Sequence, residues 1–329
     1  MPRFAIEILI LATLLLIACG EDAQVVPLTV EEALATDSQP VDQAVLDALL
    51  DDASETAIEV AHMVTFKADG AATYAAFEAA IESLRSAAGG RLVVTVDVLA
   101  AAIGASVPDV VRVVRYPSAT AYANMIQSQE YRIAARMERN AVANKTLLYG
   151  TLFTLPIPES TGSFEVPEFS GLTEEEANDM IEERGQGNDE ANRETFVQLL
   201  VDDSGESFFM VNLLDYRDEA QYTEEQIAED ESLAGLTGME ADGRYNAVVF
   251  PELLSRNSGP HRIIDVTGVL VGDNPKWERW AIVRYASPDA IMDMVFDPDF
   301  QAGSFHKFAS LEDTSAWVTR GAAQYPTDE

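Results

Sequence analysis

The stretch Val113-Val114-Arg115-Tyr116-Pro117-Ser118 decides the fold, because its centre recurs in the second half of the chain as Val283-Arg284-Tyr285. Downstream, the match continues at the same spacing without a gap. The matched pairs are Ser118 and Ser287, Ala121 and Ala290, Met125 and Met294, Ile126 and Val295, Glu130 and Asp299, and Tyr131 and Phe300. Repeats of about 100 residues can each hold a hydrophobic core, so they are duplicated domains and not short solenoid units.

The repeat also extends upstream, at a shorter spacing. Met63-Val64-Thr65-Phe66 aligns with Met210-Val211-Asn212-Leu213. Because the spacing between the repeats grows along the chain, the second repeat is expected to contain an insertion, around Tyr222–Glu240. On this alignment, His62 corresponds to Phe209.

Each repeat is predicted to follow the order β-α-β-β-α-β. In the first repeat, strands are expected at 58–66, 92–99, 110–116 and 146–155, with one helix at 71–88 and a second that Ser118 caps. In the second repeat, strands are expected at 208–214, 263–271, 280–285 and 315–319, and helices at 245–254 and 287–308, the latter broken at Pro298. This order is the ferredoxin-like split βαβ arrangement. The predicted fold class is α+β, with tandem ferredoxin-like repeats that pair as an α+β barrel.

Three stretches resemble the dimeric α+β barrel superfamily, and most closely its small, functionally uncharacterised bacterial domain family. They are Val113–Ser118, Met210–Leu214 and Asp297-Pro298-Asp299-Phe300-Gln301, and the likeness covers about 58–155 and 206–320. The resemblance implies two ferredoxin-like units that enclose a pocket, paired within the chain or in a homodimer. The superfamily includes cofactor-free monooxygenases, isomerases, haem peroxidases and members without a known reaction. Activity must therefore be argued from the residues.

Two polar residues stand on strands that are otherwise apolar, and they form the candidate ligand pocket. Asn212 and Arg284 lie on strands that neighbour each other in this topology. A buried arginine must be paired, so the two side chains are expected to bind a carboxylate or enolate oxygen. In the alternative interpretation, Arg284 and its counterpart Arg115 emerge at strand ends and contact helix carboxylates. His306, late on the last helix, and Arg115 complete the candidate pocket.

The remaining motifs argue against a metal or cofactor site. The three histidines form no spaced pair, and His62 is expected to be a packed residue of its strand. No glycine pattern for phosphate or dinucleotide binding occurs. Trp277, Trp280 and Trp317 cluster in the second repeat, either as the lining of a pocket or as core packing. We expect no metal and no cofactor.

The N-terminal region resembles a lipoprotein leader. Ile8–Ala18 is an apolar stretch too short for a membrane-spanning helix, which needs roughly 20 residues. It ends in Leu16-Ile17-Ala18-Cys19, which resembles the lipobox of bacterial lipoproteins. The resemblance implies cleavage before Cys19 and acylation of this residue, with Gly20 favouring an outer-membrane location. The alternatives are an ordinary signal peptide and an uncleaved buried helix.

Charge is distributed unevenly over a chain whose net charge is −35. The region 19–59 holds eleven acids and no Lys or Arg, and 215–242 holds ten acids and one Arg. Such acidity repels phosphates, so nucleic acid is excluded as a partner. The predicted organisation is a signal peptide (1–18), an acidic tether with a short helix (19–57), the first repeat (58–155), an acidic linker (156–194), the second repeat (195–320) with an acidic insertion near 215–242, and a tail (321–329).

We expect a membrane-anchored, periplasm-facing lipoprotein whose duplicated barrel binds a small molecule or a protein partner without catalysis. One alternative is a cofactor-independent, monooxygenase- or isomerase-like enzyme that uses Asn212, Arg284 and His306. Another is a structural role at the cell envelope. An enclosed pocket bordered by Asn212 and Arg284 would favour the first two, and a filled barrel interior would favour the third.

Overall fold

Eight strands form one closed barrel in the computed structural model, which describes residues 26–153, 165–184 and 192–323. The strands follow one another around the barrel in the order β1-β3-β2-β8-β5-β7-β6-β4, and all neighbours are antiparallel. Their bounds are β1 (Ile58–Phe66), β2 (Arg91–Ile103), β3 (Val110–Tyr116), β4 (Val142–Leu152), β5 (Phe208–Tyr216), β6 (Gly259–Val271), β7 (Arg279–Tyr285) and β8 (Leu311–Ala323). The α+β barrel predicted from the repeats is confirmed.

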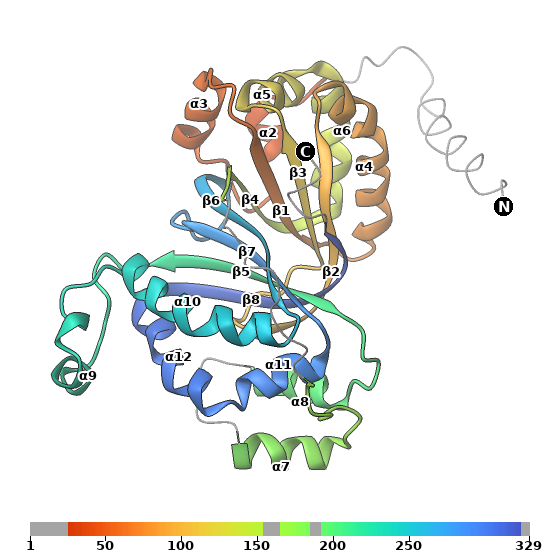
Figure 1. The fold of residues 1–329 in the computed structure, drawn as a ribbon. Helices are drawn as coiled ribbons and strands as arrows, with labels where there is room; N and C mark the ends of the chain where they lie inside the picture. Colours follow the sequence, from red (N-terminus) through yellow and green to blue (C-terminus); the bar gives the residue numbers. More distant parts are fainter. Residues whose placement is uncertain (1–25, 154–164, 185–191, 324–329) are drawn as a thin grey trace.

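Two helix layers cover the outside of the barrel, one on each repeat (Figure 1). The first layer consists of α4 (Gly70–Ala87), α5 (Ala119–Gln127) and α6 (Gln129–Ala141), and the second of α10 (Gly238–Ser255), α11 (Pro288–Val295) and α12 (Pro298–Ser310). The other helices are α2 (Val30–Leu34), α3 (Gln43–Asp51), α7 (Glu174–Arg184), α8 (Arg193–Val201), α9 (Glu224–Glu229) and the short 3₁₀ helix η1 (Glu231–Leu233). α9 and η1 belong to the acidic insertion, and α9 projects away from the body of the molecule.

The upstream alignment of the two repeats predicted from the sequence is wrong by three residues. β1 and β5 have equal lengths, and when they are aligned from end to end His62 corresponds to Asn212 and not to Phe209. Pairing with the next strand supports this, because His62 faces Arg112 and Asn212 faces Ala281, which are each the third residue of β3 and β7. Because side chains alternate between the two faces of a strand, a shift of three residues moves each of them to the opposite face.

The second repeat has extra residues in the region of the predicted insertion, but fewer than the sequence alignment indicated. α4 and α10 also have equal lengths, and they lie further apart in the chain than β1 and β5 do. The extra residues therefore lie between β5 and α10, where α9 and η1 are found. Correcting the alignment of the first strands by three residues reduces the length that has to be inserted.

The two repeats interlock through helices that precede each first strand. α3 and α8 are equivalent, since each ends shortly before the first strand of its repeat, and each is tied to the long strand of the other repeat. The N–H of Asp42 donates to the carbonyl of Leu270 at 2.8 Å, and the N–H of Asn192 donates to Ala102 at 2.8 Å. The short helix expected within the tether is therefore α3, and it is packed on the barrel, with Leu46 fully buried.

A second pair of short helices carries a matching hexapeptide. Leu28-Thr29-Val30-Glu31-Glu32-Ala33 at α2 and Leu172-Thr173-Glu174-Glu175-Glu176-Ala177 at α7 differ at one position. At α2, the Thr29 hydroxyl accepts from the N–H of Glu32, and the Glu32 carboxylate accepts from the N–H of Thr29. Thr173 and Glu176 form the same two hydrogen bonds at α7. Such a capping box starts a helix locally, so the hexapeptide accounts for both helix starts.

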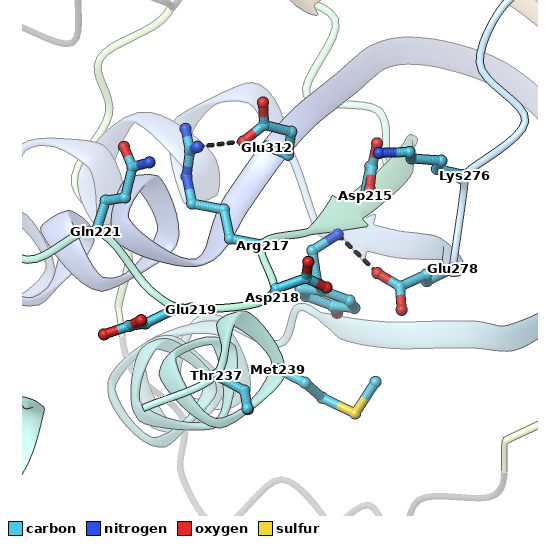
Figure 2. A pocket seen from close by; sticks show the side chains of 11 residues that line it. Asp215, Arg217, Asp218, Glu219, Gln221, Thr237, Met239, Lys276, Glu278 and Glu312 are labelled. Atoms are coloured by element: carbon cyan, nitrogen blue, oxygen red, sulfur yellow. Dashed lines mark hydrogen bonds and ion pairs between the residues drawn. The ribbon is translucent and has the colours of Figure 1, made fainter. Parts of the chain in front are cut away.

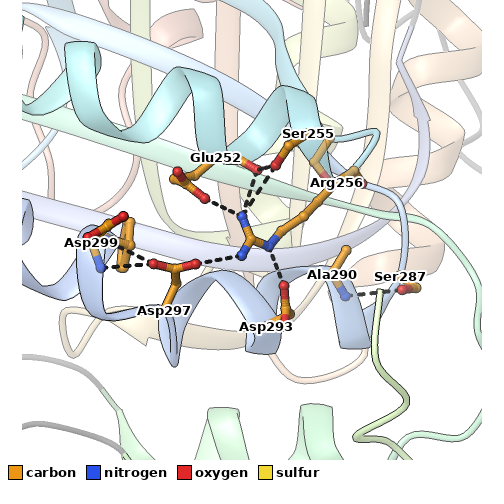
Figure 3. Close-up of polar contacts among 10 residues, drawn as sticks. Glu252, Ser255, Arg256, Ser287, Ala290, Asp293, Asp297 and Asp299 are labelled. Carbon is orange, nitrogen blue, oxygen red and sulfur yellow. Dashed lines mark hydrogen bonds and ion pairs between the residues drawn. The ribbon is translucent and has the colours of Figure 1, made fainter. Parts of the chain in front are cut away.

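The predicted break at Pro298 is confirmed, and it organises a buried ion cluster (Figure 3). Asp297 caps α12 and accepts from Arg256 Nη2 at 3.1 Å, while Asp293 accepts from Arg256 Nε at 2.6 Å. Glu252 accepts from Nη1 of the same arginine at 2.5 Å. Arg256 is 4% exposed and connects α10 to both halves of the interrupted helix. The Asp-Pro-Asp-Phe motif behind the superfamily resemblance is thus a helix start.

Candidate functional site

The interior of the barrel is filled with side chains, including the three tryptophans. Trp280 is fully buried, and Trp317 donates from Nε1 to the carbonyl of Ser106 at 2.7 Å. The interior cluster consists of Ala61, Met63, Val93, Val94, Val96, Ala101, Val111, Val113, Leu148, Val211, Leu213, Ile264, Val269, Trp277, Trp280, Ile282 and Trp317. The tryptophans therefore serve core packing. A filled interior was the outcome expected for a structural role, so a binding site has to lie outside this cluster.

The structure does not bring Asn212 and Arg284 together. Asn212 lies opposite Ala281 and Arg284 lies opposite Phe209, so the two occupy opposite faces of the barrel wall. The Asn212 side chain donates to the carbonyl of Met210 at 3.2 Å. Arg284 is half-buried and donates from Nη1 to the carbonyl of Asn257 at 3.0 Å. The predicted anion-binding pair is not formed.

Arg115 lies at one end of the barrel interior in a cluster of strand residues. Its Nη1 is 3.5 Å from Oε1 of Glu59, which also pairs with Arg262. Both Glu59 and Arg262 are almost completely buried. Arg115 therefore contacts a strand carboxylate, and the expected contact with helix carboxylates is not the one observed.

His306 lies on α12 beneath the acidic insertion, separate from the other predicted residues. Its Nδ1 is 2.8 Å from the hydroxyl of Tyr222. Burial, together with the charge of Arg244, lowers the pKa of His306. This contact fastens the insertion to the second helix layer.

A cavity of about 460 Å³ lies in the first repeat, between α4 and the strands β2 and β3. Phe66, Leu92 and Val110 contribute apolar walls, together with small alanines of α4. The polar side chains that line it are Tyr74, Glu78, Glu82, Arg85, Asp97 and Arg112. The cavity therefore combines apolar walls with several charged groups, as ligand sites do.

Two polar groups of this cavity keep unused hydrogen-bond donors among the described residues, and one of them is fully buried. Tyr74 is 2% exposed, and its hydroxyl has no hydrogen-bond partner among the described residues. Burial raises the pKa of Tyr74, so its hydroxyl stays protonated and can donate. Arg112 is half-buried, and within the described chain its guanidinium donates only to the adjacent carbonyl of Val111, at 3.3 Å. By contrast, Arg85 is paired with Glu78 at 2.9 Å.

More ionisable groups lie beneath the same helices. Lys145 and Glu138 form an ion pair at 3.1 Å, with side chains 1% and 2% exposed. His62 faces the same layer beside Arg112, and its buried Nδ1 has no partner among the residues that the structure describes. Burial, helped by the charges of Lys145 and Arg85, lowers the pKa of His62 to about 3. This histidine is therefore neutral at physiological pH.

The corresponding region of the second repeat is occupied. Arg279 stands where the first repeat has Val110, and it pairs with Asp265 at 2.9 Å. Asp242 stands where the first repeat has Tyr74, and it accepts from the Tyr216 hydroxyl at 3.0 Å. Asp242 is buried, and burial raises its pKa. The two repeats have therefore diverged at the place where the first has the cavity described above.

A larger, acidic basin of about 800 Å³ lies beside the insertion (Figure 2). Its carboxylates come from Asp215, Asp218, Glu219, Glu278 and Glu312, and its cations from Arg217 and Lys276. Arg217 pairs with Glu312. In the described ranges, no group of three or more His, Cys, Asp or Glu side chains is placed to hold a metal ion. We therefore interpret the basin as a solvated acidic surface.

The predicted leader and Cys19 lie outside the described residues. Among the helices of the described chain, none is both long and apolar enough to cross a membrane. Acylation at Cys19 therefore remains a prediction.

The cavity residues Tyr74 and Arg112 were missed from the sequence. Arg112 interrupts the β-branched run Val110–Val114, and it aligns with Ala281 in the second repeat. That mismatch was the available signal. Tyr74 has no such signal, because an aromatic residue at helical spacing indicates a core position.

A scan against protein-family models finds no match, and no curated protein matches the sequence. Several solved structures are similar to parts of the chain. A protein of unknown function from Rhodopseudomonas palustris is 24% identical, with a TM-score of 0.32, over 34% of this chain and 95% of its own.

Two further similar structures cover most of this chain. A proposed monooxygenase from Lactobacillus acidophilus is 12% identical, with a TM-score of 0.38, over 82% of this chain and 98% of its own. Chlorite dismutase from Candidatus Nitrospira defluvii is 10% identical, with a TM-score of 0.39, over 84% of this chain and 94% of its own. Likenesses this distant say nothing about activity, and the fold assignment rests on the observed strand order.

Proposed function

We propose that the chain is a membrane-anchored, periplasm-facing lipoprotein that binds a small molecule, without catalysis, in the cavity of its first repeat. The observation that carries the proposal is the unpartnered Tyr74 hydroxyl, 2% exposed in the wall of a cavity of about 460 Å³. An unmade hydrogen bond at a buried hydroxyl costs roughly 1–3 kcal/mol, and a bound ligand atom would remove this cost.

Two buried groups, Tyr74 in the cavity wall and His62 beside Arg112, favour binding over proton transfer. A general acid or base works best when its pKa is near the operating pH. The pKa of His62 is lowered to about 3 and the pKa of Tyr74 is raised well above its usual value, so both keep their protonation state. The enzymatic alternative relied on Asn212, Arg284 and His306, which lie in separate surroundings.

The anchoring part of the proposal is supported by Leu16-Ile17-Ala18-Cys19 at the end of an apolar stretch. Several acyl chains, each contributing about 0.8 kcal/mol per buried methylene, hold a folded domain at a bilayer. The acidic surface of the chain also disfavours close contact with anionic lipids.

Two matched variants test the binding function. Ala75 and Ala76 are both exposed alanines of α4, but only Ala75 lines the cavity. Protein purified from its native membrane is examined by native mass spectrometry for a retained small molecule. We expect Ala75→Phe to lose this molecule and Ala76→Phe to keep it. Equal retention in both variants, or no retained molecule in the unmodified protein, would contradict the proposal.

A further inference from the structure

The inner part of the cavity is built to receive an anionic oxygen. Arg112 offers guanidinium N–H groups, and its one hydrogen bond within the described chain goes to a neighbouring carbonyl. Tyr74 offers a buried hydroxyl that has no acceptor there. A guanidinium and a phenol hydroxyl together can donate to the two oxygens of one carboxylate. The Glu78 carboxylate pairs with Arg85 at 2.9 Å, and within the described chain it accepts from neither Tyr74 nor Arg112.

The mouth of the cavity carries negative charge, in contrast to the hydrogen-bond donors of its inner part. Glu82 on α4 and Asp97 on β2 both line it, and both are exposed. Neither forms an ion pair within the described residues. These two carboxylates face any molecule that enters, so they repel a simple anion and attract a cationic group.

Between the two polar ends, the walls are apolar. Phe66, Leu92 and Val110 form them together with Ala75 and Ala79 of α4. Phe66 and Tyr74 are in contact, with ring centroids 5.2 Å apart, so an aromatic surface borders the space. A hydrocarbon or aromatic body between two charged ends fits these walls.

We propose that the cavity binds a small zwitterion, with its carboxylate directed to Arg112 and Tyr74, an apolar body along α4, and a cationic group at Glu82 and Asp97. This inference rests on the proposed binding function and specifies its ligand class. A plain carboxylate satisfies the inner groups but meets two carboxylates at the mouth. A plain amine satisfies the mouth but makes no contact with Arg112, and it leaves the buried Tyr74 hydroxyl without an acceptor, which costs free energy.

Three probes of similar shape separate these cases: 4-(aminomethyl)benzoate carries both charges, 4-methylbenzoate carries the anion, and benzylamine carries the cation. Binding to the full chain is measured by isothermal titration calorimetry at low ionic strength. We expect 4-(aminomethyl)benzoate to bind at least about tenfold more tightly than either other probe, since one well-made charged contact contributes this much.

Variants then assign each end of the ligand. Arg112→Met should reduce the affinity for the zwitterion to that for benzylamine, and Arg112→Lys should restore part of it. Glu82→Gln with Asp97→Asn should reduce it to the affinity for 4-methylbenzoate. Glu194→Gln, at an exposed acid that does not line the cavity, is the control and should change nothing.

The result that overturns the inference differs from the one that overturns the binding function. If the singly charged probes bind as tightly as the zwitterion, or if none of the three binds, the ligand class is wrong. The binding function still stands in that case, provided that the native molecule is lost in Ala75→Phe and kept in Ala76→Phe. If the two alanine variants behave alike, the cavity is not the binding site at all.

Discussion

His62 and Asn212 occupy the same position in the two halves of the barrel, at the centres of β1 and β5. Each lies on the helix-facing side of its strand, opposite Arg112 and Ala281 respectively. The pair marks the divergence of the two repeats, because the histidine lies beside the cavity and the asparagine bonds to its own strand at Met210.

Replacing His62 by asparagine, the residue of the second repeat, should change the pH dependence of stability. The pKa of His62 is lowered from 6.5 to about 3, so between these values the unfolded chain binds a proton that the folded chain does not. Stability from the neutral histidine is therefore present above pH 6.5 and is lost as the pH falls towards 3, by up to about 1.4 kcal/mol per pH unit. His62→Asn should flatten this dependence in urea unfolding between about pH 4 and 7. An unchanged slope would show that the histidine is solvated.

Breaking the buried pair of Lys145 and Glu138 should be severe. Lys145→Met leaves a fully buried carboxylate without its cation and should lower the free energy of unfolding by about 3–5 kcal/mol. The pKa of Glu138 is already raised by burial, so the variant should regain stability as the pH falls and this carboxyl is protonated. The double variant Lys145→Met with Glu138→Leu is the control, and denaturant unfolding should place it close to the original protein. A double variant as unstable as the single one would argue against this reasoning.

Arg256 should contribute strongly to the stability of the second helix layer. Removing its side chain in Arg256→Ala leaves Glu252, Asp293 and Asp297 near one another without their shared cation, and should cost about 3–5 kcal/mol. Arg320→Ala serves as the comparison, because its pair with Asp202 is partly exposed to solvent and should contribute less than about 1 kcal/mol. Thermal unfolding of the two variants should separate them clearly, and similar melting temperatures would contradict the prediction.

Gly70 and Gly238 begin the equivalent helices α4 and α10, and both should resist substitution. A Cβ atom at Gly70 would lie 2.2 Å from the carbonyl oxygen of Ala141, and one at Gly238 would lie 2.4 Å from that of Ser310. Gly70→Ala and Gly238→Ala should therefore destabilise the fold. At Gly243, also in α10, a Cβ meets nothing within 4 Å. Gly243→Ala should stabilise by roughly 0.5–1 kcal/mol, since alanine is the better helix former. Chemical denaturation distinguishes the opposite signs.

If Cys19 is acylated, this residue should determine whether the protein is bound to the membrane. Cys19→Ser should block processing, so that the protein no longer carries acyl chains and runs as a longer precursor. Mass spectrometry of the N-terminal peptide and detergent partitioning measure both effects. If the serine variant is cleaved normally and still partitions with membranes, the lipoprotein assignment is wrong.

Local signals explain which parts of the fold could be predicted. The run of β-branched residues at Val110–Tyr116 and the proline that begins α12 each determine structure within a few residues, and the structure has both as predicted. The alignment of the first strands had no such signal, because only pairing with β3 and β7 sets their register. The cavity could not be predicted either, because it depends on the size of one residue in the third strand of each repeat. Val110 leaves the space open in the first repeat, and the longer Arg279 occupies the corresponding space in the second. The hexapeptides at Leu28–Ala33 and Leu172–Ala177 were visible in the sequence and would have extended the repeat.

The packing of α2 and α3 on the barrel limits the radius within which an acylated form could work. Leu28 is 8% exposed and Leu34 and Leu46 are fully buried, so the chain is already held by the barrel from Leu28 onwards. Only residues 20–27 then separate the barrel from Cys19, and even a fully extended segment of that length reaches roughly 30 Å. A connection of this length would confine the acylated form to the solvent layer next to the lipid headgroups. It would therefore meet its ligand at the membrane surface and not across the width of the periplasm.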